Sequence, residues 1–176
     1  MTQPDELDAA RARFPVGEQV TGRVARMPRP GSIGLLVNLG QAPEGFVDAL
    51  HLPREPDQWP PVGTVMTFEV LTHRPGQVRL LPLDGQFRSP HRLPGDLAPE
   101  QWLARKSRFP VGTVVTATVT DVYQPNRECV VRFEDCWAVL EWTTDAPQIG
   151  TASRYTVTRH LDQTQRIMLT PAPPPP

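Results

Sequence analysis

Residues 13–17 read RFPVG, and residues 108–112 repeat the same five letters, with a third PVG at 61–63. After both full copies the chain alternates apolar and polar residues, in EQVTGRVARM (18–27) and TVVTATVTDV (113–122). A period of two residues is typical of a β-strand with one buried face. The repeated letters therefore predict the same local event twice, the entry to a β-strand.

Short helices are predicted immediately before both copies. Residues 4–13 and 99–107 each open with proline and acidic residues and continue in helix-forming residues. Further strand patterns follow, at 32–40, 44–52, 60–71 and 77–83 after the first copy, and at 128–135, 136–142, 149–160 and 165–171 after the second. About five short strands per copy, with no helix long enough to cover an open sheet, predict that each copy closes into a small barrel.

The same alternation predicts the interior of each barrel. The expected core residues are Val24, Val37, Leu39, Val70 and Leu80 in the first copy, and Val119, Val131, Phe133, Val157 and Leu169 in the second. Leu7 and Trp102 are expected to anchor the two helices. The predicted domains are 1–84 and 99–171, with a polar linker rich in Pro and Gly at 85–98 and a disordered Pro-rich tail at 172–176.

The charge balance does not favour nucleic-acid binding through phosphate neutralisation alone. The 176 residues carry a net charge of −1, whereas phosphate-binding chains usually show a basic excess. Every basic residue except Lys106 is arginine. The planar guanidinium suits phosphate contacts and stacking. Biased codon usage is the favoured explanation, because alanine and proline are abundant too.

The location and redox state follow from simple absences in the sequence. No apolar stretch approaches the roughly 18 to 20 residues needed to cross a bilayer, and the opening MTQPDELDAARAR contains no apolar run for a secretion signal. We therefore expect a cytoplasmic protein without a membrane partner. Cys129 and Cys136 flank a predicted hairpin turn at Glu134 and Asp135, so free thiols are expected, and two cysteines alone form no zinc site.

Catalysis is not predicted. His51, His73, His91 and His160 are scattered without metal-ligand spacing, and neither a phosphate-binding glycine loop nor a nucleophile motif is present. We expect no catalytic residue, no metal site and no cofactor. His73 and His160 fall at corresponding places near the end of the fourth strand of each copy, which duplication is sufficient to explain.

Five landmarks occur in a fixed order between residues 13 and 84. Val16 and Gly17 precede a strand that ends Gly22-x-Val24; IGLLVNLG (33–40), EGFVDAL (44–50), PVG (61–63) and VRLLPLD (78–84) follow. This order resembles the RNA-binding domain named after ribosomal protein S-one, and residues 108–171 match more loosely, mainly through the first copy. The resemblance implies a mainly β protein with two tandem five-stranded OB-fold-like barrels, each preceded by a short helix.

The sequence departs from this family at its RNA-binding positions. The family stacks RNA bases on two aromatics of the second strand and contacts them with a histidine of the third. The matching residues here are Ile33, Leu36 and Asp48, and the nearest equivalents in the second copy are Arg127, Val130 and Val139. Stacking is worth roughly 1–3 kcal/mol per base, so losing three rings predicts much weaker binding unless other residues compensate. Asp48 adds a negative charge where a phosphate would approach.

Arginines are the candidates for compensation. They are Arg23 and Arg26 on the first strand, Arg29 in the following loop, and Arg74 and Arg79 around the last hairpin, with Arg127 in the second copy. The alternative is that these residues are simply the solvated polar positions of half-buried strands.

The aromatic residues are expected to serve mainly in packing. Phe46 occupies the family's apolar core position and is expected in the core. Trp137 and Trp142 have odd spacing on one strand, so we expect one in the core and the other exposed as a contact residue. Trp59 and Trp102 are expected to pack between elements.

Two functions remain open on the sequence. The favoured one is non-catalytic binding of RNA or single-stranded nucleic acid by an OB-fold barrel with degenerate aromatic sites. The alternative is a protein-interaction or regulatory module that kept the barrel and lost nucleic-acid binding. The missing rings, Asp48 and the near-zero net charge argue for this second function.

Overall fold

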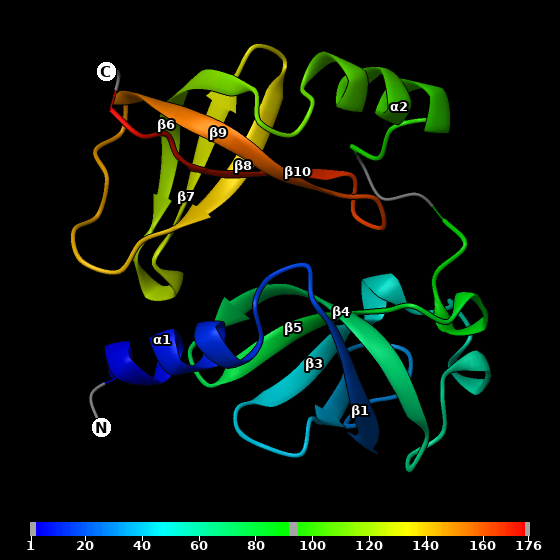
Figure 1. The fold of residues 1–176 in the computed structure, drawn as a ribbon. Helices are drawn as coiled ribbons and strands as arrows, with labels where there is room; N and C mark the ends of the chain where they lie inside the picture. Colours follow the sequence, from blue (N-terminus) through cyan, green and yellow to red (C-terminus); the bar gives the residue numbers. More distant parts are fainter. Residues whose placement is uncertain (1–2, 92–94, 175–176) are drawn as a thin grey trace. The chain divides into compact units, whose positions relative to one another are not determined.

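The chain forms two compact units, Met1–Arg92 and Leu93–Pro176, and the division falls within the segment 85–98. The computed structural model describes residues 3–91 and 95–174 (Figure 1). The first unit contains α1 (Gln3–Arg13), β1 (Gln19–Arg26), β2 (Gly34–Asn38), β3 (Glu44–Asp48), β4 (Val65–Arg74) and β5 (Gln77–Pro82), with short 3-10 turns η1 (Ala49–His51), η2 (Pro56–Gln58) and η3 (Gly85–Phe87). The protein is mainly β, as predicted.

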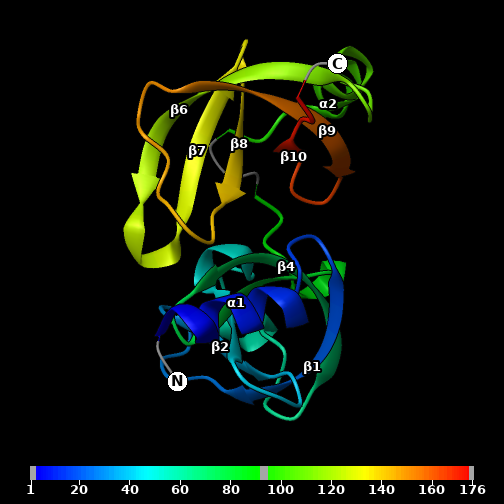
Figure 2. The same cartoon turned by 60° about the vertical axis from the view of Figure 1, so that its left-hand side comes forward.

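The sheet of the first unit closes into a barrel. Its strands follow the order β1-β2-β3-β5-β4, and β4 pairs back with β1. All neighbours are antiparallel except β3 and β5, which run parallel where Glu44–Phe46 meets Gln77–Arg79. This parallel pair completes the circle, so each strand has a neighbour on both sides. Figures 1 and 2 show the strands wrapping around a common interior, and the closed OB-fold-like barrel is confirmed for this unit.

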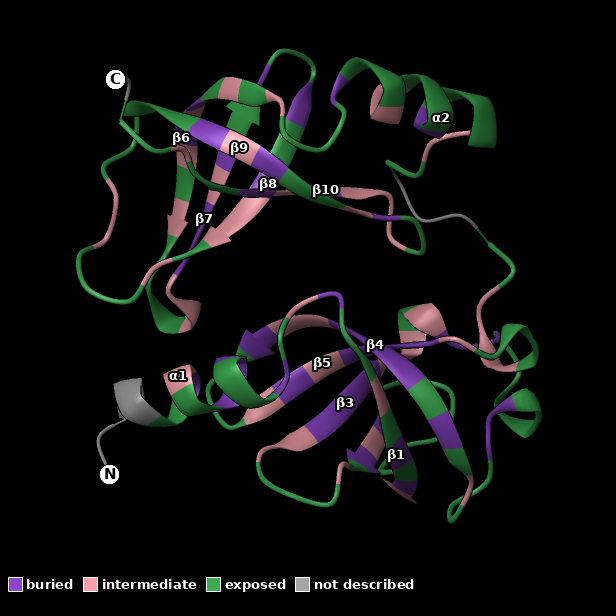
Figure 3. Ribbon diagram, viewed as in Figure 1, coloured by how far each residue is buried: buried purple, intermediate pink, exposed green. Residues whose placement is uncertain are grey.

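Apolar side chains from every strand fill the barrel. Val24, Val37, Val70 and Leu80 are fully buried as predicted, and Leu39 packs against them from a partly buried position. Buried residues alternate with exposed ones in the first half of β4, from Val65 to Phe68 (Figure 3). Trp59 also joins this core, and its indole Nε1 donates a hydrogen bond to the Pro53 carbonyl 2.7 Å away.

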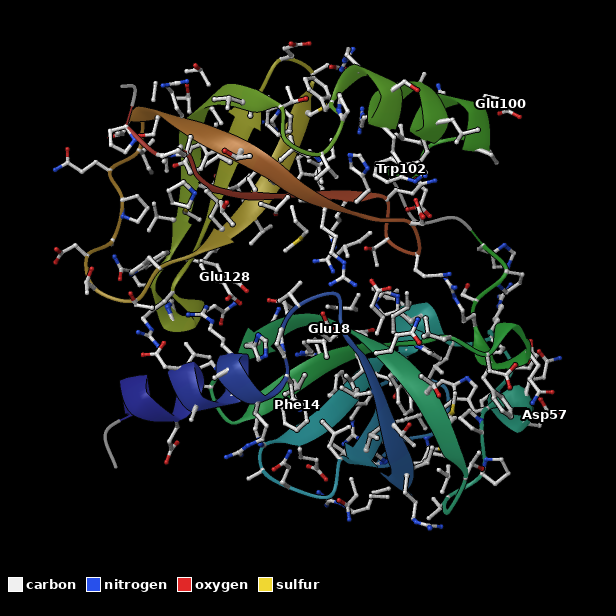
Figure 4. All side chains as sticks on the ribbon, viewed as in Figure 1. Phe14, Glu18, Asp57, Glu100, Trp102 and Glu128 are labelled. Carbon is white, nitrogen blue, oxygen red and sulfur yellow. The ribbon has the colours of Figure 1, made fainter. Side chains whose placement is uncertain are left out.

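The RFPVG stretch carries the chain from α1 into the barrel. α1 contacts β4, its Leu7 and Ala10 are buried, and Phe14 enters the core directly after the helix (Figure 4). Gly17 then takes φ of 83°, a left-handed conformation that favours glycine. From there its N–H donates to the Val70 carbonyl of β4 at 2.8 Å. The repeated motif is therefore a turn that places the chain beside the fourth strand.

The second unit repeats the helix and the five strands in the same order. It contains α2 (Pro99–Arg108), β6 (Val114–Tyr123), η4 (Gln124–Asn126), β7 (Glu128–Phe133), β8 (Cys136–Glu141), β9 (Ala152–Leu161) and β10 (Arg166–Pro171). Its sheet runs β10-β9-β6-β7-β8. With five added to each strand number, this is the circular order of the first unit, opened between the third and fifth strands. Ala172 donates its N–H to the Arg154 carbonyl at 3.0 Å, and residues 175 and 176 of the predicted tail lie outside the described residues.

The second sheet is not closed, which corrects the prediction of two closed barrels. Its end strands β8 and β10 contact each other, but within residues 95–174 no backbone pairing joins them. The connection before the third strand differs between the units. Residues 39–43 separate β2 from β3, whereas only Glu134 and Asp135 separate β7 from β8, whose whole length stays paired with β7. The second unit thus differs from the first both in the length of this connection and in the missing pairing between its third and fifth strands.

Equivalent backbone hydrogen bonds are made at the two glycine turns of each unit. The N–H of Gly112 donates to the Val157 carbonyl at 2.8 Å, as Gly17 does to Val70 in the first unit. At the later turn, Gly63 donates to Val24 and Gly150 donates to Val119, both at 2.8 Å. The two units thus share strand order and the hydrogen bonds that anchor their first strands.

The second unit has its own apolar core, which α2 covers. Val119, Val131, Phe133, Val157 and Leu169 are buried in it, as predicted. Cys129 and Cys136 are buried there as free thiols, because the register places Leu140 and Phe133 opposite them. Burial raises the pKa of both thiols. Within the described residues, neither helix is long and apolar enough to cross a membrane.

Trp102 attaches α2 to this core, and only 5% of its surface is exposed (Figure 4). Its Nε1 donates to Asp162 Oδ1 at 2.8 Å, and Lys106 Nζ donates to the same oxygen at 2.7 Å. The His160 ring meets the indole edge-on, and His160 Nε2 lies 2.8 Å from the Phe109 carbonyl. The predicted anchoring role of Trp102 agrees with this burial.

Candidate nucleic-acid interface

Four side chains form a transverse row on the outer face of the first barrel. The register places Arg26 of β1 opposite Leu36 of β2, Leu36 opposite Phe46 of β3, and Phe46 opposite Arg79 of β5. The residues on either side of Leu36 and Arg79 are buried in the interior, so these two side chains point outward. We call Arg26, Leu36, Phe46 and Arg79 the outer row.

Arg26 reaches this face because of a β-bulge. In a regular strand Arg26 would share the inward face of Val24, two residues earlier. The register shifts between Val24 and Arg26, which turns Arg26 outward to pair with Leu36. Both predicted arginines of β1, Arg23 and Arg26, therefore lie on the outer face despite their odd spacing.

Phe46 is buried, as predicted, but it does not join the interior cluster of the barrel. It lies instead on the outer face. The Arg79 guanidinium carbon lies 4.3 Å from the centre of its ring. At this distance a guanidinium over a ring face is held by a cation–π contact. Phe46 therefore supports Arg79 from below.

Asp48 has two partners in the structure. Its Oδ1 accepts a hydrogen bond from the N–H of Leu50 at 3.0 Å, which caps the short turn η1. Its Oδ2 lies 3.9 Å from Arg79 Nη1. The carboxylate is thus a structural cap and a counter-ion for Arg79, and the negative charge predicted at this face is partly balanced.

Arg79 lies in a positively charged setting despite this partner. Burial lowers the pKa of Arg79, nearby Arg74 lowers it further by charge repulsion, and Asp48 opposes both effects. The Arg79 side chain is 21% exposed. Arg74 and Arg79 thus repel each other at this end of the outer row, and Asp48 offsets part of that repulsion.

The remaining predicted arginines differ in the contacts that their side chains make. Arg26 forms an exposed ion pair with Glu44 at 3.6 Å. Arg23 Nη1 donates to the Gly63 carbonyl at 2.9 Å. Arg29 is exposed in the loop after β1, where its carbonyl accepts from Ser32 and Ile33. Exposed ion pairs are worth little, so Glu44 holds Arg26 only weakly.

Apolar residues stand at the two positions of β2 where the sequence resemblance implied stacking rings, and they form no flat platform. Ile33 is 40% exposed just before β2, and Leu36 is half-buried at the centre of the outer row. Gly34 between them has φ of 134°, and a Cβ there would lie 2.0 Å from the Val47 carbonyl oxygen. Only glycine fits this approach of β2 to β3, which positions Ile33 at the edge of the face.

In the second unit, the predicted match of Val139 to Asp48 is wrong. Val139 pairs with Val130 as Phe46 pairs with Leu36, so Val139 corresponds to Phe46. The position of Asp48 is occupied by Glu141, which faces Glu128. Arg127 has φ of 47° and its Nη1 donates to the Thr143 carbonyl at 3.1 Å. This bond ties Arg127 to the loop after β8.

Sequence reasoning missed the role of Phe46, although a signal was present. Asp48 was placed on the ligand-facing side, and residues two apart on a strand share a face. The same period assigns Val47 to the interior, where it is fully buried. Sequence reasoning also missed Arg132, which lies opposite Trp137 on the outer face of β7 and β8. Trp137 is exposed and Trp142 is half-buried against the core, as expected for this pair.

No metal-binding group emerges from the fold. Among the side chains that the structure describes, no three His, Cys, Asp or Glu residues gather to hold an ion. His73 and His160 occupy matching positions, opposite Val78 and Ile167, but His73 is fully buried whereas His160 is partly exposed.

The first unit is thus a closed five-stranded barrel with a mixed apolar and arginine outer face. No family model matches the sequence, and neither does any curated protein sequence. A multidomain protein with nucleic acid binding domains from Streptococcus pneumoniae is 14% identical with a TM-score of 0.32, over 89% of this chain and 51% of that one. GSP13 from Bacillus subtilis is 20% identical with a TM-score of 0.36, over 52% of this chain and 71% of that one. This chain spans about half the length of the first protein. At such TM-scores, neither likeness defines the function.

Proposed function

We propose that this protein is a non-catalytic binder of single-stranded nucleic acid, RNA in the first place, and that it binds through the outer face of the first barrel. One observation carries the proposal: Arg79 lies over the Phe46 ring in the outer row, 4.3 Å from its centre. Bases stack on guanidinium planes as well as on aromatic rings. Arg79 backed by Phe46 thus takes over the stacking role of the lost rings.

The neighbouring residues suit the other parts of a nucleotide. Leu36, beside Phe46 in the register, and Ile33 offer apolar contact to a base or sugar. Arg74 lies close enough to Arg79 to lower its pKa, and Arg26 stands at the opposite end of the row. Both cations are exposed and suited to phosphate contacts. The ligand would cross β5, β3, β2 and β1 along the outer row.

The proposal includes membership of the S-one type for the first unit and a tandem origin for the second. The five sequence landmarks coincide with the strands and turns of a closed barrel. The shared strand order and the matching hydrogen bonds of Gly17 and Gly112 support duplication. In this account the second unit is a divergent copy whose barrel has opened between β8 and β10.

A protein-interaction module is the second candidate, and a specific observation favours it. Two of the arginines on the face already have acidic partners, Arg26 with Glu44 at 3.6 Å and Arg79 with Asp48 at 3.9 Å. A face neutralised in this way is suited to a polar protein surface as well as to a polyanion.

The deciding experiment measures binding of a fluorescently labelled oligouridylate by anisotropy over a series of salt concentrations. We expect log K to fall with log salt by roughly 0.7 per phosphate contact. Arg79→Glu should abolish binding, and Arg79→Lys should weaken it because the charge stays while the stacking plane is lost. Arg54→Glu is the matched control, since Arg54 is exposed in the loop between η1 and η2, outside the outer row.

The outcomes separate the two functions. Selective loss in the Arg79 variants, with Arg54→Glu close to wild type, supports the proposed face. Equal losses in Arg79→Glu and Arg54→Glu would show unspecific charge attraction and overturn it. A wild-type protein without affinity for the oligonucleotide even at low salt would favour the protein-interaction module.

A further inference from the structure

Trp137 is the one tryptophan in the described residues with more than half of its surface exposed. It lies on β8 with 51% of its surface accessible, whereas Trp59 and Trp102 are buried and Trp142 is half-buried. Its neighbours along the strand, Cys136 and Ala138, are buried in the core, so the indole stands on the outer face of the sheet. A large exposed ring on a rigid strand is a preformed contact surface.

A cation stands directly beside this ring. The register pairs Trp137 with Arg132 of β7, and Thr118 of β6 follows on the other side of Arg132. Cβ atoms of directly opposite residues lie about 4.5–5.5 Å apart, so ring and guanidinium share one small surface. Arg132 is exposed and forms no ion pair with any residue that the structure describes. It differs in this from Arg26 and Arg79.

The acidic residues nearest to Trp137 along the chain are already neutralised. Glu134 and Asp135 form the turn that precedes β8. Arg108 pairs with both, its Nε lying 3.6 Å from Glu134 Oε2, and Arg105 lies 3.7 Å from Asp135. An anion approaching Arg132 therefore meets little uncompensated negative charge from this turn.

The first unit has no such pair at the corresponding positions. By strand register Trp137 corresponds to Glu44 and Arg132 corresponds to Asn38, because Val131 and Ala138 occupy the places of Val37 and Gly45. The Trp137 surface is thus specific to the second unit. It also lies outside the three positions at which the resemblance placed stacking residues.

We propose that Trp137 and Arg132 form a second nucleotide-binding site, in which the indole stacks on a base and the guanidinium holds the adjacent phosphate. The site rests on the proposed function and extends it to the second unit. A nucleotide combines a flat π face with a negative charge, and this surface offers the complement of both. Val130 and Val139, the next pair on the same face, offer further apolar contact to a base or sugar, while Arg132 and Thr118 supply polar groups beside the ring.

The test combines oligouridylate titration with variants of the exposed ring in the full chain. Base stacking on Trp137 should quench the exposed part of the tryptophan fluorescence. Trp137→Leu keeps an apolar side chain without a π face and should weaken binding roughly 5- to 140-fold, whereas Trp137→Phe should retain most of the affinity. Tyr123→Leu is the matched control, because Tyr123 is also exposed but faces Glu128, whose other neighbour is Glu141.

Arg132→Gln should weaken binding and reduce the salt dependence by about one phosphate contact. Circular dichroism of each variant checks that the second unit is folded. Equal affinity of Trp137→Leu and Trp137→Phe, or the same loss in Tyr123→Leu, would overturn the stacking site. Loss in Arg79→Glu with no effect of Trp137→Leu would refute only this site, whereas wild-type protein without any oligonucleotide affinity would refute the proposed function itself.

Discussion

The Arg79 guanidinium lies over the Phe46 ring with its carbon 4.3 Å from the ring centre, on the outer face of a closed barrel. The two residues are direct partners of the parallel pair β3 and β5, the pair that closes the barrel. Barrel closure and the arrangement of the candidate binding face are therefore linked at one point. Any opening of β3 from β5 would separate Arg79 from its support.

Phe46→Leu tests this support. The substitution keeps an apolar side chain of similar burial but removes the ring face, so the cation–π contribution of roughly 0.5–1 kcal/mol should be lost. We expect oligonucleotide affinity to fall while the barrel stays folded, because Phe46 lies outside the interior cluster. Anisotropy titration and thermal unfolding measure the two effects. A large drop in melting temperature with unchanged affinity would show that Phe46 serves packing alone.

Asp48→Asn should strengthen nucleic-acid binding. The carboxamide retains an oxygen that accepts from the N–H of Leu50, so the cap of η1 is kept, while the negative charge beside Arg79 disappears. Asp48→Ala is the comparison, since it removes both charge and cap and should cost about 0.5–2 kcal/mol of stability. Salt titrations measure the affinity of both variants, and urea unfolding measures their stability, so the effect of the charge is separated from the effect of the cap. Weaker binding by Asp48→Asn would mean that the carboxylate positions Arg79 for the ligand.

Trp102→Ala should destabilise the second unit by roughly 3–5 kcal/mol, because a buried tryptophan and its hydrogen bond to Asp162 are both lost. For a domain of this size the melting temperature should drop by about 10 °C or more. Leu103→Ala is the control on the same helix, since Leu103 is 59% exposed and its truncation should change little. Scanning calorimetry distinguishes them. Equal small shifts in both variants would show that α2 is only a spacer.

Asp162 predicts a dependence of stability on acid pH. Hydrogen bonds from Lys106 and Trp102 lower the pKa of Asp162 in the folded protein. A lowered folded pKa contributes stability above the unfolded pKa of about 3.9, and this contribution is lost as the pH falls through the folded value. Asp162→Asn should therefore flatten the decline of melting temperature below about pH 5. Identical pH profiles of the two proteins would show that the carboxylate charge does not stabilise the attachment of α2.

Strands, helices and core residues follow from short-range patterns in this chain. The alternation around Val24 and Val119 placed both strands and both interiors, since burial of one face imposes a period of two on the local sequence. RFPVG predicted the entry to each first strand, and the structure forms a turn there, in which Gly17 and Gly112 adopt positive φ values of 83° and 93°. Proline and acidic residues before each copy predicted the helices for similarly local reasons.

Which side chains point outward, and whether each sheet closes into a barrel, depended on contacts that local sequence patterns do not encode. The bulge after Val24 turned Arg26 outward, which breaks the period on which a sequence argument relies. The pairing of β3 with β5 joins segments about thirty residues apart, and it alone decided that Phe46 supports Arg79. The register of β7 with β8 assigned Glu141, not Val139, to the place of Asp48. The amino-acid sequence by itself determined which segments become strands, because each strand buries its own alternating residues. Only the tertiary structure decided which outward side chains become neighbours, because register, bulges and closure arise from pairing between strands that are distant in the chain.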